Sequence, residues 1–381
     1  MRQPLVRSLL TALVAWVLTT AVGPARAEGP LVFISAFAAG DRGGIQACQL
    51  DLHTGVLKPL HRTADVKNPF YLALSPDRRF LYSIHAEQFG GKEHEQVAAF
   101  QVADRAGRLK LLNRQSALGS AACYLDVDKT GKALLVANYL TGSVASLPVG
   151  PDGSLGKAVS FLQHAGSSVD PARQKGPHAH CIVVSPDNRH AYAADLGLDQ
   201  VLGYRLEADG ARLTPARQPF VRTPPGAGPR HLTFHPNSKH LYAINELANS
   251  VTLFDHDPET GILIERQTLS TLPAEFTGKS YCADLKVTPD GRFLFGTNRG
   301  HDSIACYRVG RDGRLTRVGI EPSLGKGPQN LAVTPDGKLL LCANMPGNNV
   351  AVFRIDPETG ALKSAGTPLA LPSPSCIRLM P

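Results

Sequence analysis

The chain has 381 residues and a formal net charge of +8, from 40 Lys and Arg against 32 Asp and Glu. The basic residues are dispersed, and no basic run interleaves with aromatic residues. This composition excludes the electrostatic pattern of a nucleic-acid-binding protein, while a local positive site for a small anion remains compatible with it.

The first 27 residues have the pattern of a cleaved signal peptide. Arg2 and Arg7 give a positive start, an apolar run extends over residues 9–22, and Ala25-Arg26-Ala27 fits a small-x-small cleavage site. A membrane anchor is the alternative, but the run is short for the roughly 20 residues that span a bilayer. We therefore predict that the mature chain, residues 28–381, is exported to the periplasm or secreted without stable membrane association.

A turn motif, often Ser-Pro-Asp or Thr-Pro-Asp-Gly, recurs through the rest of the chain. Its marker positions are Pro76, Lys129, Pro186, Pro236, Pro289, Pro335 and Pro381, spaced by 46 to 57 residues. Short runs of alternating apolar and polar residues lie between the turns and predict about four strands per unit. Seven such units predict an all-β fold, a single-domain seven-bladed β-propeller over residues 28–381.

The two ends of the chain complement each other in this repeat. Three strand-like segments near the N-terminus, 31–35, 44–50 and 56–60, lack a marker strand before them. The C-terminal segment 376–380 is a marker strand with nothing after it. We predict that these four strands share one blade, which closes the ring and removes an exposed sheet edge.

The cysteines are interpreted as small buried hydrophobic residues. They are Cys48, Cys123, Cys181, Cys282, Cys306, Cys342 and Cys376. None forms a C-x-x-C pair, which argues against a zinc site, and most lie in predicted strands of different units. The alternative is that some of the cysteines form one or two disulfides, because an exported protein can form them.

The repeat also predicts which side chains meet at one mouth of the ring. If the marker strand is innermost and the next strand is antiparallel, the residue six before each marker meets the residue ten after it. Most residues at these positions are neutral, and the ionisable ones are His180, Arg230, Glu246 and Arg299. Arginine binds carboxylates and phosphates, and Glu or His can act as a general base, so we predict a site for a small anion.

Several neighbouring features have alternative assignments from the sequence. His178 and His231 are further candidates for substrate binding, although His231 also fits a supporting structural role. The alternative to a catalytic role for Arg230 and Glu246 is that they form a structural ion pair. Insertions at 89–95 and 164–176 are expected to shape a mouth or lid. An asparagine nine residues after the marker recurs in four units, so we interpret it as turn chemistry: Asn138, Asn245, Asn298 and Asn344.

The sequence GPRHLTFHPN from Gly228, followed by YAINEL from Tyr242, resembles the signature of the lactonase family of seven-bladed propellers. This family includes propeller-type 6-phosphogluconolactonases and carboxymuconate cyclases. The stretches GPHAH from Gly176 and ADLKVTPDG from Ala283 fit the neighbouring blades, and the resemblance covers residues 31–381. It implies that the site residues of the cyclase branch correspond to His180, Arg230, Glu246 and Arg299.

The leading hypothesis is a lactone hydrolase of the 6-phosphogluconolactonase type, a carboxylic ester hydrolase without cofactor or metal. Arg230 and Arg299 would hold the anionic group and the developing oxyanion, and Glu246 or His180 would activate water. The alternatives are a lactonising isomerase of the carboxymuconate cyclase type and a non-catalytic ligand-binding propeller. The expected partner is a small anionic lactone or sugar acid, and the chain is expected to be a monomer.

Overall fold

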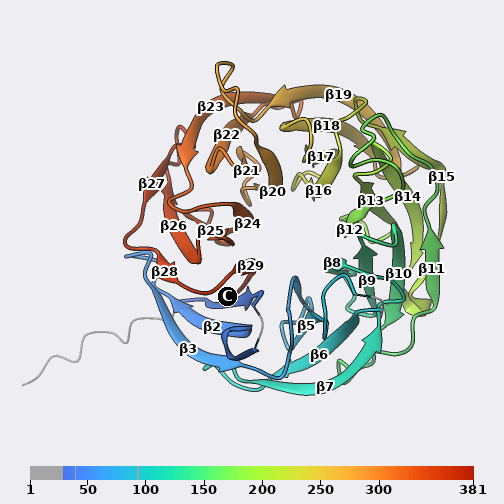
Figure 1. The fold of residues 1–381 in the computed structure, drawn as a ribbon, viewed down its shortest axis with the longest axis vertical. Helices are drawn as coiled ribbons and strands as arrows, with labels where there is room; N and C mark the ends of the chain where they lie inside the picture. Colours follow the sequence, from blue (N-terminus) through green and yellow to red (C-terminus); the bar gives the residue numbers. More distant parts are fainter. Residues whose placement is uncertain (1–28, 39, 92–93) are drawn as a thin grey trace, which may run out of the picture.

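The computed structural model describes residues 29–38, 40–91 and 94–381, so the predicted signal peptide lies outside the described residues. The described residues form seven antiparallel sheets arranged as blades of a ring (Figure 1). The helical segments within these ranges are two 3₁₀ turns, η1 (Gly40–Arg42) and η2 (Ala208–Gly210). No helix in this part of the chain is long and apolar enough to cross a membrane. The prediction of an all-β seven-bladed propeller is confirmed.

The blades follow the chain in order, and each is written here from its innermost strand outwards. Blade 1 is β4 (Leu72–Leu74), β5 (Phe80–His85), β6 (Gln96–Val102) and β7 (Leu109–Ser116). Blade 2 is β8 (Ala122–Val127), β9 (Ala133–Asn138), β10 (Ser143–Pro148) and β11 (Ser160–Gln163). Blade 3 is β12 (Ala179–Val184), β13 (His190–Asp195), β14 (Gln200–Glu207) and β15 (Arg212–Arg222).

The second half of the ring continues the same pattern. Blade 4 is β16 (Pro229–Phe234), β17 (His240–Asn245), β18 (Ser250–Asp257) and β19 (Ile262–Ser270). Blade 5 is β20 (Tyr281–Val287), β21 (Phe293–Arg299), β22 (Ser303–Val309) and β23 (Leu315–Pro322). Blade 6 is β24 (Pro328–Val333), β25 (Leu339–Asn344) and β26 (Asn349–Ile355), with β27 (Leu362–Ser364) and β28 (Leu369–Ala370) both paired to β26.

Blade 7 joins the two ends of the chain. It consists of β29 (Pro374–Met380), β1 (Leu31–Ala36), β2 (Gly44–Leu50) and β3 (Leu57–Thr63). β29 is antiparallel to β1, with Ile34 opposite Ile377. The hydroxyls of Ser35 and Ser375 add a buried hydrogen bond of 2.8 Å. The predicted shared blade is confirmed, and Figure 1 shows the red C-terminal strand beside the blue N-terminal strands.

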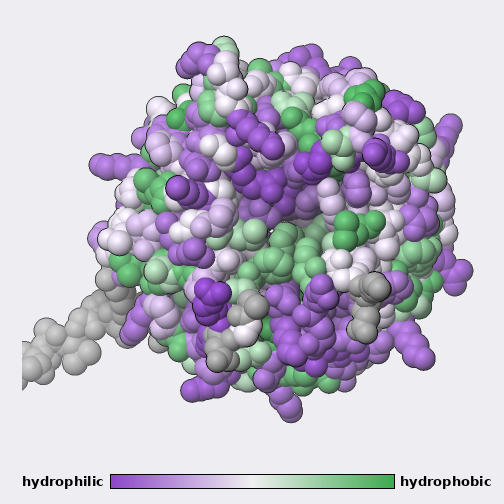
Figure 2. Space-filling view, viewed as in Figure 1, coloured by the Kyte–Doolittle hydropathy of each residue, from purple (hydrophilic) through white to green (hydrophobic). Residues whose placement is uncertain are grey.

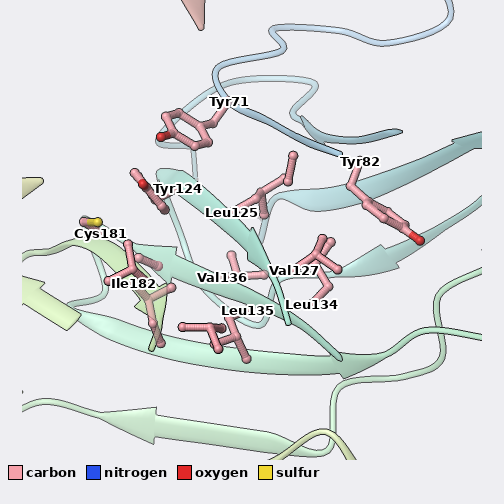
Figure 3. Packing of buried hydrophobic residues seen from close by; sticks show 14 of the residues in the cluster. Tyr71, Tyr82, Tyr124, Leu125, Val127, Leu134, Leu135, Val136, Cys181 and Ile182 are labelled. Carbon is pink, nitrogen blue, oxygen red and sulfur yellow. The ribbon is translucent and has the colours of Figure 1, made fainter. Parts of the chain in front are cut away.

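The core lies between the faces of adjacent blades. Strands such as β9 and β12 are buried along their whole length, because both faces of an inner strand pack against a neighbouring blade. Figure 3 shows this packing among buried residues of blades 1 to 3, which include Tyr82, Leu125, Val136 and Ile182. In the same view the rings of Tyr71 and Tyr124 face each other with centroids 4.2 Å apart. All seven cysteines are buried free thiols, in agreement with their interpretation as small hydrophobic residues.

Tyrosine hydroxyls also tie neighbouring blades together. Each donates to the carbonyl of a turn glycine in the next blade: Tyr82 to Gly153 at 3.2 Å, Tyr192 to Gly261 at 2.8 Å, and Tyr242 to Gly313 at 2.7 Å. Gly153 has a φ of +81°, and a Cβ there would lie 2.2 Å from the ring of Phe80. These hairpin turns therefore need glycine both for backbone conformation and for close contact between blades.

The recurrent asparagines have a structural role. The side-chain amides of three of them each donate a hydrogen bond of 3.0 Å to a backbone carbonyl. The accepting residues lie in the connection between the outermost strand of one blade and the innermost strand of the next: Asn138 donates to Ala117, Asn298 to Thr271, and Asn344 to Ser323. All three asparagines are fully buried. These contacts agree with the interpretation of this position as turn chemistry.

Candidate active site

A β-bulge recurs near the start of the innermost strand, at the position six residues before the turn marker. The ladder registers skip one residue on β8, β12, β16 and β24, and the skipped residues are Cys123, His180, Arg230 and Gln329. A bulge bends its strand and re-aims the side chain of the extra residue. These four side chains all line one cavity at the mouth of the ring.

The cavity has a volume of about 290 Å³. Its lining residues are Phe70, Phe89, Ala121, Cys123, Tyr139, Arg173, His180, Arg230, Glu246, Arg299, Gln329 and Met345. All except Phe89, Ala121 and Arg173 occupy the two repeat positions from which the site was predicted. A second hollow has a larger volume, about 900 Å³. Its described lining residues all belong to the segment 85–96, so it does not combine residues from several blades as the first cavity does.

The cavity has an apolar side and a charged side. Phe70 and Phe89 come from the first blade, and their rings lie 5.1 Å apart beside Phe37 of the last blade. The charged lining residues and the histidine come instead from blades 3, 4 and 5 and from the segment before β12. Figure 2 shows a hollow near the centre of one face of the ring, with hydrophobic surface on one side and hydrophilic surface on the other. Such a lining suits a small ligand with an apolar face and several polar groups.

Glu246 is the centre of the charged side. Its Oε2 accepts hydrogen bonds from Nε of Arg230 at 3.0 Å and from Nη2 of Arg299 at 2.7 Å. Its Oε1 accepts one from Nη2 of Arg173 at 2.7 Å. Glu246 follows β17, so the antiparallel pairing of β16 and β17 brings it to Arg230 within the same blade.

This arrangement fixes the charge of the carboxylate. Burial alone would raise the pKa of Glu246, but Arg299, Arg230 and Arg173 outweigh it and lower the pKa to about 2. The carboxylate is therefore ionised at neutral pH and is a weak base. Three guanidinium charges against one carboxylate charge leave two positive charges on the cavity wall.

Behind Arg230 lies a buried chain of hydrogen bonds. Nη1 of Arg230 donates to Nε2 of His231 at 3.1 Å and to the carbonyl of Ala283 at 2.5 Å. Because arginine only donates, Nδ1 of His231 carries the proton and donates to Asp284 at 2.8 Å. Burial and the Arg230 charge lower the pKa of His231 to about 3, so this imidazole stays neutral. Arg230 is thereby held from both sides and is only 1% exposed.

His180 lines the cavity as a neutral imidazole. Burial, followed by the charge of Arg230, holds its pKa well below the ordinary value. Its Nδ1 lies 3.5 Å from Sγ of Cys123, and Nε2 has no hydrogen-bond partner among the described residues. A neutral imidazole with a free nitrogen at a cavity wall can accept a proton from a bound water.

The two remaining candidates lie off the cavity wall. His178 stacks on Tyr139 with ring centroids 4.5 Å apart and donates from Nδ1 to the Tyr139 carbonyl at 3.0 Å. It therefore supports a lining residue rather than lining the cavity itself. His231 lies behind Arg230, as described above. The structure thus gathers His180, Arg230, Glu246 and Arg299, and leaves the two other histidines in supporting positions.

One charged lining residue, Arg173, was not among the predicted site residues. It belongs to the insertion 164–176, which has no equivalent in the other blades, so counting from the turn markers could not find it. The signal that was available was the length of the insertion, which predicted a mouth-shaping loop. Among the described residues, no group of three or more His, Cys, Asp or Glu side chains is arranged to hold a metal ion.

Comparison with known proteins defines the family. The model of the family described as "Lactonase, 7-bladed beta-propeller" matches residues 31–379. The chain therefore belongs to the seven-bladed lactonase family, as the sequence motifs around Arg230 and Glu246 predicted.

Relatives and solved structures with high coverage agree with this assignment. The 6-phosphogluconolactonase of Bacillus subtilis (strain 168) is 35% identical over 350 residues, covering 91% of this chain and 97% of the relative. The 6-phosphogluconolactonase of Formosa agariphila is 31% identical, covering 79% and 85%. The structure of the periplasmic gluconolactonase of Pseudomonas aeruginosa superposes with a TM-score of 0.86 and 34% identity, covering 92% of this chain and 99% of that chain.

Proposed function

We propose that this chain is a lactone hydrolase that opens the ring of a sugar-acid lactone in the cavity formed around Glu246. The observation that carries the proposal is that a neutral histidine and three arginines line one cavity of about 290 Å³. Membership of the lactonase family, and similarity to enzymes named 6-phosphogluconolactonase and gluconolactonase, support the same chemistry.

The reaction needs a base, an oxyanion partner and an acid. Nε2 of His180 removes a proton from water, and the hydroxide oxygen attacks the lactone carbonyl carbon to form a tetrahedral oxyanion. Among the described residues, Nη2 of Arg230 has no hydrogen-bond partner, so it is the donor we assign to that oxyanion, with Arg299 beside it. The ring C–O bond then breaks, and the proton on His180 passes to the departing alkoxide, which gives the open hydroxy acid.

Glu246 has a different role in this proposal from the base suggested by the sequence alone. Both of its oxygens accept hydrogen bonds from arginines, whereas Nε2 of His180 has no hydrogen-bond partner among the described residues and is free to bind a water. Glu246 instead orients the guanidinium groups of Arg230 and Arg299 toward the substrate. The lactonising alternative is less well supported, because that reaction needs an acid that donates a proton to carbon, and Glu246 is ionised at neutral pH.

The site of action in the cell is part of the proposal. The signal-peptide pattern of residues 1–27 and the similarity to a periplasmic gluconolactonase support work outside the cytoplasm. The mature chain is proposed to act there as a monomer on a small lactone, without membrane association.

The test is turnover of lactones by the purified mature protein, residues 28–381. D-glucono-δ-lactone and its 6-phosphate are added, acid release is followed at pH 7, and the spontaneous rate is subtracted. We expect hydrolysis of at least one lactone well above the spontaneous rate, with loss of most activity in His180→Gln. Absence of hydrolysis for both would contradict the proposal and favour a non-catalytic binding propeller.

A further inference from the structure

Arg173 is the cavity residue that reaches the site from outside the propeller repeat. It lies in the insertion between β11 and β12, and its side chain is 33% exposed, against 1% for Arg230. Arg173 therefore lies toward the open rim of the cavity, while Arg230 lies at its floor. A substrate whose reacting carbonyl sits near Arg230 and His180 would direct its other end toward Arg173.

The guanidinium of Arg173 is held in place but not saturated. Its Nη2 donates to Glu246 at 2.7 Å and to the Tyr139 hydroxyl at 3.2 Å, and the group lies over the Tyr281 ring at 5.8 Å. Its Nε and Nη1 have no hydrogen-bond partner among the described residues. These two free donors lie on opposite edges of the guanidinium, so each can donate to a separate oxygen of an anionic ligand, and the positive charge attracts a phosphate or carboxylate.

The backbone that carries Arg173 is fixed by buried hydrogen bonds. The next residue, Gln174, is fully buried and donates to the Leu196 carbonyl and to Asp199, both at 2.8 Å. Asp199 also accepts from Ser168 of the same insertion at 2.6 Å and from the backbone of Gly228 at 2.7 Å. The insertion is thus tied to the turn that leads into Arg230, and Arg173 is preorganised for binding.

The charge balance of the cavity-lining residues indicates which kind of ligand Arg173 would bind. Glu246 is the one acidic residue among the described cavity-lining residues, and it offsets one of the three arginines. A neutral lactone would leave two positive charges unmatched in a partly buried site, whereas a phosphate dianion would match both. We propose that Arg173 is a specificity-determining residue that selects sugar-acid lactones carrying a phosphate group. This inference rests on the proposed lactonase function of the same cavity.

The experiment compares Arg173→Gln with wild type on D-glucono-δ-lactone and its 6-phosphate. We expect wild type to prefer the phosphorylated lactone, and the ratio of the two kcat/KM values to fall about 10- to 100-fold in the variant, as for loss of a charged hydrogen bond. Arg173→Lys keeps the charge but not the planar guanidinium with its separate Nε and Nη1 donors, so its ratio should lie between those of wild type and Arg173→Gln. Arg217→Gln removes an exposed arginine of the outer strand β15 and serves as the matched control, with an unchanged ratio.

Binding gives a second readout that does not need turnover. Calorimetry with 6-phosphogluconate and gluconate should show a selective loss of affinity for the phosphorylated acid in Arg173→Gln. An equal loss for both ligands, no loss for either, or a wild type without preference for phosphate would overturn the assignment. Selective loss of binding in a protein that hydrolyses neither lactone would uphold Arg173 as the phosphate reader and reject the hydrolase proposal instead.

Discussion

Arg230 and Glu246 form an ion pair at the floor of the cavity, with Nε and Oε2 3.0 Å apart and side chains only 1% and 7% exposed. The pair was the structural alternative to a catalytic carboxylate in the sequence interpretation. Its geometry makes Glu246 a counter-ion shared with two further arginines, so the proposed base is the neighbouring His180. The first two predictions separate these roles.

Glu246→Gln keeps the side-chain shape and removes the charge that three arginines share. Breaking a buried ion pair leaves an uncompensated charge, so we expect the free energy of unfolding to fall by about 3 kcal/mol. Activity should fall as well, because the arginines lose their orientation. Urea unfolding together with kcat/KM measures both effects. An unchanged unfolding midpoint, with a loss of kcat as large as in His180→Gln, would return Glu246 to the role of base.

His180→Gln removes the proposed base without removing a charge. We expect kcat to fall by about 10²–10⁴-fold while the melting temperature changes little. His178→Gln is the matched control, because His178 stacks behind Tyr139 and lies off the cavity wall. A His180 variant with the wild-type kcat on a lactone that wild type clearly hydrolyses would rule out this mechanism.

The buried charges predict a loss of stability in acid. The pKa of Glu246 is lowered to about 2 from an ordinary value of 4.5, so its stabilising contribution is lost as the pH falls from 4.5 toward 2. The pKa of His231 is lowered to about 3 from 6.5, so the unfolded chain takes up this proton first and stability falls from pH 6.5 downwards. Each group contributes about 1.4 kcal/mol per pH unit within its window.

Urea unfolding between pH 7.5 and 4 tests this pH dependence. His231→Gln should give a flatter dependence between pH 6.5 and 4.5 than wild type. His53→Gln, at an exposed turn position, should retain the wild-type slope. Equal slopes in all three proteins would show that His231 is not responsible.

Deletion of residues 375–381 removes most of β29, the innermost strand of blade 7. The deletion breaks the pairing with β1 and the hydrogen bond between Ser35 and Ser375. We expect a large fall in melting temperature or loss of the cooperative transition, measured by calorimetry. Deleting only the exposed Pro381 is the control. A truncated protein that melts cooperatively at the wild-type temperature would contradict the need for ring closure by this strand.

Export is tested directly on the N-terminus. Mass spectrometry of the protein expressed from the full-length sequence in a bacterial host should give a chain that begins near Glu28. Recovery of an intact segment from Met1 to Ala27 on the exported protein would support a membrane anchor in place of a cleaved signal.

The repeat made most of the fold predictable. Turn markers recur because each blade needs the same tight hairpin between its first two strands, and the spacing gave the number of blades and the shared blade. The same counting identified His180, Arg230, Glu246 and Arg299, because antiparallel pairing brings the start of one strand to the end of the next.

The electrostatics of the site could not be read from spacing. The pKa of Glu246 depends on three guanidinium groups, and one of them, Arg173, comes from a loop without a repeat equivalent. The supporting positions of His178 and His231 depend on ring stacking and on a hydrogen bond to Asp284, which only the packed structure defines. The repeat therefore predicts which residues line the cavity, whereas the loop that carries Arg173 and the packing around His178 and His231 set their charges and supporting contacts.

The recurrent bulge has a consequence for how such a site can change over evolution. Because the bulged residue lines the cavity, substitutions there alter the cavity wall directly. Cys123 and Gln329 occupy this position and belong to no ion pair with the arginine cluster. A single mutation at either one introduces a new acid, base or binding group at the cavity wall, so related rings can acquire different substrates while they keep the same strand topology.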